Sequence, residues 1–152
     1  HLLADEPDYA ERAARFSAQV RDITEFLATR KFLRQPRPLN LRVTYQEPCH
    51  LVSAQRISKA PRQLLHRIPG LQLIEMEESA VCCGSAGIYN ITQPDMSERL
   101  QERKIHHTQE TAADIVITAN PGCFLQLQSG LHKAGSSMQV MHIVDVLDMA
   151  YR

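Results

Sequence analysis

The four cysteines are the residues of this 152-residue chain whose type and spacing most directly suggest chemistry. Cys82 and Cys83 are adjacent, whereas Cys49 lies 33 positions before Cys82 and Cys123 lies 40 positions after Cys83. A cysteine that only packs behaves as a small apolar group and can lie anywhere in a core. One cysteine, then an adjacent pair, then one more, each group far from the next in sequence, instead suggest thiolates that converge on one centre from separate loops. The alternative is four unrelated thiols.

Composition excludes several classes of protein. The 17 Lys and Arg residues balance the 17 Asp and Glu residues and are scattered, so no basic footprint for nucleic acid is present. No apolar run approaches the length of a membrane span, and no signal peptide opens the chain. Four cysteines are too few for a disulfide scaffold and favour metal binding or redox chemistry. Because the chain begins at His1 rather than Met, we expect a fragment or a processed piece.

Short apolar runs alternate with helical patterns after residue 36. The runs occupy residues 41–45, 71–76, 115–119 and 138–142, and the helical patterns occupy residues 61–68, 94–111, 121–133 and 144–150. This alternation predicts an α/β fold: a small, mostly parallel, Rossmann-like sheet of about four strands with flanking helices. A chain of this length is expected to form one domain with its own core, divided into an N-terminal helix and linker (1–36) and the α/β part (37–152).

The N-terminal segment predicts one long helix from about residue 8 to residue 30. Asp8 and Glu11 resemble a capping box, and apolar residues then recur at alternating steps of three and four: Ala13, Phe16, Val20, Ile23 and Leu27. Such a helix would be about 35 Å long, whereas a five-residue strand spans about 17 Å.

Part of this apolar stripe therefore lies beyond the sheet. We expect it to pack against another domain or chain, or to drive self-association. The alternative is a kink near Thr24 that folds the whole helix onto its own sheet.

All four cysteines follow predicted strands. Cys49 comes four residues after the first strand, the Cys82–Cys83 pair follows the second beyond an acidic stretch, and Cys123 follows the third. His142 ends the fourth strand. Parallel sheets bind ligands at the carboxyl ends of their strands. The placement therefore predicts one shared site at that edge.

The residues around the cysteines suit thiolates. Asn120 and Pro121 are typical of the N-cap and first position of a helix, which would place Cys123 at the third position. The positive end of the helix dipole there is expected to lower the pKa of Cys123. Gly84 and Gly87 permit positive φ angles or a close approach of the backbone.

Four histidines fall into two pairs with different expectations. His50 and His142 border the predicted site, where each either supports a ligand or is an ordinary helix-start or core histidine. His106 and His107 lie in a polar helix and are expected on a solvated face.

Three motifs together resemble the CCG cysteine-rich domain family: Glu47-Pro48-Cys49-His50, Cys82-Cys83-Gly84-Ser85-Ala86-Gly87 and Asn120-Pro121-Gly122-Cys123. The family includes one of the subunits of heterodisulfide reductase, and iron–sulfur subunits of lactate, glycerol-3-phosphate and glycolate dehydrogenases. The run 81–90 and the ending 144–152 are most similar to the C-terminal CCG domain of the glycolate oxidase (glycolate dehydrogenase) iron–sulfur subunit.

The resemblance implies a non-catalytic, electron-transfer part of an oxidoreductase complex. Electrons would pass from a flavin-containing subunit, which oxidises glycolate to glyoxylate, towards a membrane quinone. The partners would be that flavin subunit and the absent ferredoxin-like and first CCG domains. The expected location is cytoplasmic, or peripheral on the inner face of the cell membrane as part of the complex.

The implied cofactor is an iron–sulfur cluster, such as 4Fe-4S, held by Cys49, Cys82, Cys83 and Cys123. The fullest family pattern ends in Cys-x-x-Cys and has five thiols, whereas Asn120 replaces the first of that pair here. Four thiolates suffice for an ordinary cluster or a tetrahedral zinc site. Two alternatives stay open: a structural or interaction domain with zinc or an empty site, and thiol–disulfide chemistry by Cys82 and Cys83.

Overall fold

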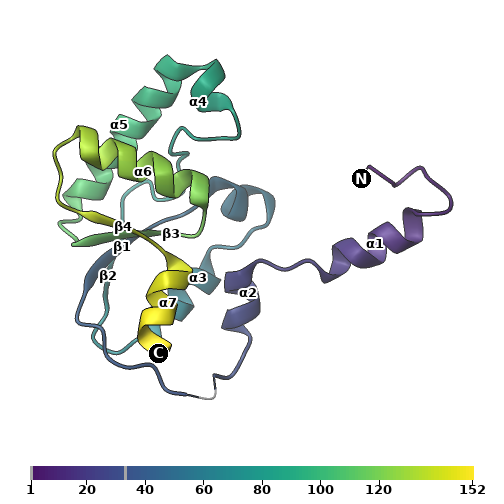
Figure 1. Ribbon diagram of the computed structural model, residues 1–152, viewed down its shortest axis with the longest axis horizontal. Helices are drawn as coiled ribbons and strands as arrows, with labels where there is room; N and C mark the ends of the chain where they lie inside the picture. The colour runs from purple at the N-terminus through teal and green to yellow at the C-terminus, as the bar shows by residue number, and fades with distance from the viewer. Residues whose placement is uncertain (1, 33) are drawn as a thin grey trace.

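The computed structural model describes residues 2–32 and 34–152. Its centre is a four-stranded parallel sheet in the order β2-β1-β3-β4 (Figure 1). The strands are β1 (Arg42–Gln46), β2 (Gln72–Ile74), β3 (Ile115–Thr118) and β4 (Gln139–His142). The predicted α/β fold is confirmed, with β1 and β3 at the centre of the sheet.

The helices connect and cover the strands. They are η1 (His50–Ala54), α3 (Lys59–His66), α4 (Tyr89–Thr92), α5 (Pro94–Glu110), α6 (Pro121–Lys133) and α7 (Ile143–Tyr151). The four helices predicted after residue 60 are present, with ends within about two residues of the expected ones. The short elements η1 and α4 were not predicted, because each is about one turn long and carries no resolvable apolar period.

Two hydrophobic clusters fill the two faces of the sheet. On one face, side chains of β1 and β3 pack with α3 and α7, and Val43, Tyr45 and Ile117 are almost fully buried there. On the other face, Val116 packs with residues of α5 and α6. Successive residues of a strand point to opposite faces, so the central strand β3 contributes to both clusters. Figure 1 shows α5 and α6 on one side of the sheet and α3 and α7 on the other.

The prediction of one continuous N-terminal helix is wrong. The segment forms α1 (Ala10–Gln19) and α2 (Ile23–Ala28), which are separated by three residues. Asp22 is the N-cap of α2, and its Oδ1 accepts a hydrogen bond from the Thr24 N–H at 2.8 Å. An N-cap residue has extended backbone, so a helix cannot continue through it. The predicted cap at Asp8 is also wrong, since α1 begins without a side-chain cap.

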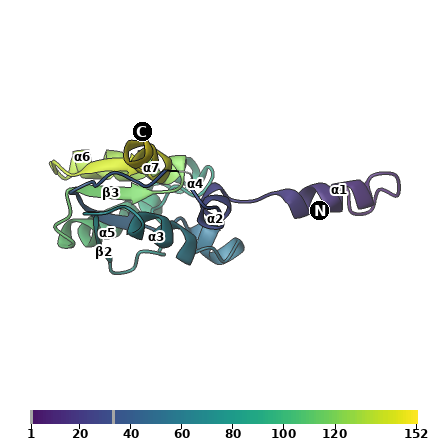
Figure 2. The ribbon, with the colours of Figure 1, turned by 90° about the horizontal axis from the view of Figure 1, so that it is seen from below.

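Helix α1 stands clear of the rest of the molecule in both views (Figures 1 and 2). None of its residues is buried: Phe16 is 72% exposed, and Val20, which directly follows the helix, is 62% exposed. Helix α2 packs on α3, with Leu27 half-buried against the main core. The expectation of an uncovered apolar stripe is thus met at Phe16 and Val20, and α1 does not fold onto the sheet.

No helix in the described ranges is long and apolar enough to cross a membrane.

The two candidate caps give a direct test of the N-terminal architecture. Replacing Asp22 by Ala should lower the free energy of unfolding by about 1 kcal/mol, because it removes the N-cap of a helix that packs on the core. The matched change Asp8→Ala should leave stability within about 0.3 kcal/mol of the parent. Urea unfolding followed by circular dichroism measures both. Equal losses in the two variants would contradict the assignment of Asp22 as the functional cap.

Candidate functional site

The structure confirms that the cysteines follow the strands at the carboxyl edge of the sheet. Cys49 follows β1 and is the N-cap of η1, and Cys123 is the third residue of α6 after β3. Cys82 and Cys83 lie in the segment between β2 and α4. Because the four strands are parallel, all these loops leave the same edge of the sheet.

Two of the sulfurs are in direct contact. The Sγ atoms of Cys83 and Cys123 lie 3.2 Å apart and share a hydrogen bond, and both residues are buried. A disulfide would bring the sulfurs to about 2.05 Å, and all four cysteines are free thiols. Cys49 and Cys82 are half-buried. The site therefore has a buried pair and a more accessible pair of thiols.

The two buried thiols have different pKa values. The hydrogen bond shared with Cys123 lowers the pKa of Cys83 to about 6, and the backbone N–H of Ser85 acts in the same direction against burial. The pKa of Cys123 is raised by its hydrogen bond to Cys83 and by burial. The expectation of a low pKa at Cys123 is thus wrong.

Its helix-start geometry is nevertheless confirmed, because Asn120 Oδ1 accepts from the Cys123 N–H at 2.9 Å. The effect of the helix N-terminus on the Cys123 thiol is outweighed by the neighbouring Cys83 thiolate, which a sequence does not reveal.

Gly84 permits the tight backbone that follows the cysteine pair. Its φ angle is +93°, and a Cβ atom there would lie 2.4 Å from the Ser97 carbonyl oxygen. Its N–H donates to Cys82 Sγ at 3.3 Å. Burial nevertheless raises the pKa of Cys82, and the nearby Cys49 and Cys83 add to that effect. Gly87 also has a positive φ, of 57°, in open surroundings.

The sulfur spacing bears on which group the site could hold. Among the described residues, the one set of three His, Cys, Asp or Glu side chains whose ligand atoms all lie within 4.8 Å of one another is His106, His107 and Glu110. No three of the four sulfurs meet that criterion. A tetrahedral zinc ion with Zn–S bonds of about 2.3 Å would require sulfurs about 3.8 Å apart. The 3.2 Å between the Sγ atoms of Cys83 and Cys123 is within that spacing, whereas no set of three of the sulfurs is gathered within 4.8 Å.

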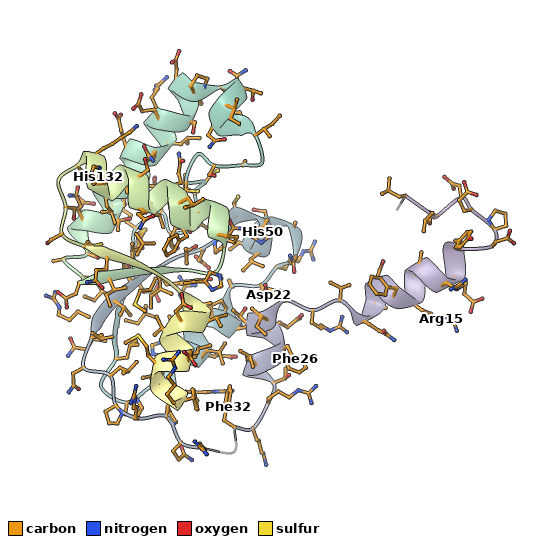
Figure 3. The ribbon with its side chains drawn as sticks, in the orientation of Figure 1. Arg15, Asp22, Phe26, Phe32, His50 and His132 are labelled. Carbon is orange, nitrogen blue, oxygen red and sulfur yellow. The ribbon has the colours of Figure 1, made fainter. Side chains whose placement is uncertain are left out.

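The histidines near the site have ordinary structural positions. His142 is the N-cap of α7, where Nδ1 accepts from the Val144 N–H at 3.4 Å. His50 is exposed at the first residue of η1, and Figure 3 shows it at the opposite end of α6 from His132. His106 is exposed as expected, whereas His107 is half-buried between the carboxylates of Glu78 and Glu110.

Sequence reasoning missed a polar clamp between two cysteine loops. Glu47 precedes the Cys49 loop and is 7% exposed; its carboxylate accepts from Ser79 Oγ at 2.5 Å and from Arg62 Nη1 at 2.8 Å. The Glu47 N–H also donates to the Ser79 carbonyl at 3.1 Å. Burial alone would raise the pKa of Glu47, but the hydrogen bonds from Arg62 and Ser79 hold it below its usual value. The clamp fixes the Cys49 loop relative to the segment that carries Cys82.

A second missed feature is a stripe of buried polar side chains on α5. Its members recur at steps of four, three and four residues: Ser97, Gln101, Lys104 and Thr108. Ser97 Oγ donates to the Gly84 carbonyl at 2.7 Å, and Thr108 Oγ1 contacts Met76 Sδ at 3.7 Å. The helical spacing was readable from the sequence, but polar residues on a charged helix normally indicate a solvated face.

Comparison with known proteins agrees with this arrangement. The sequence model of the family described as "CCG: Cysteine-rich domain" matches residues 43–128, more than half of the chain. The chain belongs to the CCG cysteine-rich domain family. The match spans β1 to the middle of α6 and contains all four cysteines.

Several curated proteins are similar over nearly the whole chain. The probable glycolate oxidase iron–sulfur subunit of Bacillus subtilis is 41% identical over 97% of this chain and 34% of its own length. A fumarate reductase (CoM/CoB) subunit of Methanothermobacter marburgensis is 42% identical over 87% of this chain and 27% of its own length. Lactate utilization protein A of Halalkalibacterium halodurans is 30% identical over 97% of this chain and 61% of its own length. The CCG chain thus spans about a third of the first two relatives.

The shared proton of Cys83 and Cys123 predicts a pH dependence of stability. In the folded, metal-free chain the lowered pKa of Cys83, about 6, leaves the pair with one proton above that pH, while Cys123 stays protonated. In the unfolded chain both thiols titrate near 8.5. Between about pH 6 and 8.5 the unfolded state binds one more proton, so stability should rise by up to about 1.4 kcal/mol per pH unit. Above about pH 8.5 it binds one fewer, and stability should fall.

Urea unfolding under reducing, metal-free conditions checks this prediction. The contribution of the pair is the difference between the parent chain and the Cys83→Ser/Cys123→Ser variant, which lacks both thiols and keeps every other titratable residue. A difference that stays constant from pH 6 to 8.5 would show that the two thiols do not share a proton.

Proposed function

We propose that this chain is the electron-transfer CCG domain of the iron–sulfur subunit of a flavin-dependent glycolate dehydrogenase. The observation that carries the proposal is the meeting of four free thiols at one sheet edge, with Cys83 and Cys123 in contact and buried. The likeness to a glycolate oxidase iron–sulfur subunit supports the choice of substrate. The relatives named for fumarate reductase and lactate utilization support the broader role as an iron–sulfur domain of oxidoreductases.

The residues at this edge fit an iron–sulfur cluster held by Cys49, Cys82, Cys83 and Cys123. A bound cluster would supply one-electron transfer, and thiolates are its usual ligands. Cys83 is disposed to be a thiolate, since its pKa is lowered to about 6. The Gly84 N–H donates to a second sulfur, and hydrogen bonds to sulfur tune the potential of such clusters. We propose a supporting role for Gly84 and Asn120 in holding the thiols, and leave His50 and His142 outside the ligand set.

The remaining partners are those that the family resemblance implies, and the relatives are long enough to hold further domains. We propose that the complete subunit also contains a ferredoxin-like part and a first CCG domain, and works with a flavin-containing dehydrogenase subunit. It would act in the cytoplasm, or at the inner face of the membrane as part of that complex, to pass electrons towards quinone. The division into residues 1–36 and 37–152 is our proposal for how this chain joins those parts.

Replacement of Cys83 by Ser should abolish the cluster. Chain purified without oxygen, or reconstituted with iron and sulfide, should contain both elements in similar amounts and absorb broadly near 400 nm. The Cys83→Ser variant should lose at least about nine-tenths of that iron, because serine supplies no thiolate, and its circular dichroism should stay close to that of the parent. Iron and sulfide analysis with electron paramagnetic resonance measures the outcome.

The other candidate site provides a matched control. The His106→Ala/His107→Ala variant should keep full iron content, since those histidines lie outside the thiol edge. Zinc without iron in the parent chain would favour the structural alternative. A parent chain with neither metal that forms a reversible Cys82–Cys83 disulfide would favour thiol–disulfide chemistry. Unchanged iron in Cys83→Ser would remove Cys83 from the ligand set.

We also propose that α1 is an interface helix. The exposed Phe16 lies on this helix, which has no buried residue, and the exposed Val20 directly follows it, in a chain that spans about a third of its first relatives. In the isolated chain this surface should cause self-association, since apolar patches of this kind are seldom left bare. Sedimentation velocity should show dimers or larger species for the parent chain and a monomer for Phe16→Asp/Val20→Asp. A Leu125→Asp variant, altered at another exposed apolar residue, should associate like the parent.

A further inference from the structure

Lys104 is the least expected residue near the thiols. It lies in the middle of α5 and is 2% exposed, although lysine is almost never fully buried unless it is paired. Its ammonium group donates hydrogen bonds to the backbone carbonyls of Glu78 and Ser79. No carboxylate oxygen is within hydrogen-bond distance of this ammonium group in the described part of the chain. A buried positive charge is thus held by carbonyls of the turn that leads into Cys82 and Cys83.

Two features link Lys104 to the thiol edge. The first is mechanical, because the Ser79 carbonyl that it binds also accepts from the Glu47 N–H, just before the Cys49 loop. One ammonium group thereby ties α5 to the turn where two cysteine loops meet. The second is electrostatic. The ammonium group is held by the Ser79 carbonyl, only three residues before Cys82. Burial lowers the pKa of Lys104, whereas negative charge on Cys83, Glu78, Cys123 and Cys82 raises it.

We propose that Lys104 is a positioning residue and the buried counter-charge of the thiol site, which holds the Glu78–Ser79 turn and stabilises negative charge gathered at Cys82, Cys83 and Cys123. The inference rests on the proposed function only for the nature of the negative group. Thiolate ligands carry more negative charge than most metal centres neutralise, and an added electron increases that charge. A fixed cation in a poorly solvated position offsets both.

The charge and the hydrogen bonds can be separated by three substitutions. Lys104→Met removes both the charge and the donors, and Lys104→Gln removes the charge but keeps an amide that can donate to a carbonyl. Lys104→Arg keeps the charge. Lys133→Met is the matched control, because it makes the same change in net charge at an exposed lysine, about 15 Å along α6 from Cys123.

The first measurement needs no metal. The half-buried thiol of Cys82 is alkylated at one pH with iodoacetate, which is negative, and with iodoacetamide, which is neutral, and the rates are determined by mass spectrometry. The rate with iodoacetate divided by the rate with iodoacetamide reports the local electrostatic potential, since the thiolate fraction affects both reagents equally. The ratio should fall by about threefold or more in Lys104→Met and Lys104→Gln. It should be largely retained in Lys104→Arg and unchanged in Lys133→Met.

The second measurement is a redox titration of the reconstituted protein, in which Lys104→Met and Lys104→Gln should have a more negative reduction potential than the parent. An unchanged rate ratio in Lys104→Met, or an equal fall in Lys133→Met, would overturn the role of Lys104 even if the parent binds a cluster. A fall in the ratio confined to the Lys104 variants supports that role even if the parent binds no cluster. In that case the proposed function is wrong, and the role of Lys104 stands. If Lys104→Met does not fold, Lys104→Gln decides by the same criteria.

Discussion

The arrangement of the thiol edge depends on hydrogen bonds from α5 to a segment that has almost no secondary structure of its own. Strand β2 ends at Ile74, and the next helix, the single-turn α4, begins at Tyr89. The cysteine pair lies between them, without a strand ladder or a helix to fix its backbone. Three polar side chains on one face of α5 contact this segment instead: Ser97, Lys104 and Thr108. The buried stripe on this helix therefore stabilises a particular loop conformation rather than the sheet.

The molecule keeps this polar layer apart from its main hydrophobic core. The larger cluster lies between the sheet and helices α3 and α7, whereas the face towards α5 and α6 has only a small apolar cluster. On that second face the ends of the central strands carry Gln46 and Thr118, whose side chains are hydrogen-bonded at 2.7 Å. Buried polar groups remain tolerable only when they are paired. The bond between Gln46 and Thr118 thus allows these two polar side chains to be buried, while the opposite face holds the larger hydrophobic cluster.

Much of the fold could be predicted from sequence because the signals were local and repeated. Apolar runs gave the strands, and the parallel topology then brought Cys49, Cys82, Cys83 and Cys123 to one edge. The failures concern competition between signals. At Asp22, an N-cap interrupts an apolar stripe that otherwise continues through α1 and α2. At Cys123, the helix-start effect is outweighed by contact with Cys83, a residue 40 positions away. Lys104 resembled any other charged residue of a polar helix, since only the tertiary structure shows which side of α5 faces the loop.

The unequal exposure of the thiols gives the site a buried end and a more accessible end. Cys83 and Cys123 are buried, whereas Cys49 and Cys82 are half-buried. An occupant held by all four sulfurs would be insulated by protein behind and would meet the surroundings at the Cys49 and Cys82 end. Electron tunnelling weakens steeply with distance, so a donor or acceptor docked over that end would have the shortest route. Electrons that enter and electrons that leave would therefore cross the same small surface, and a donor and an acceptor would have to dock there in turn.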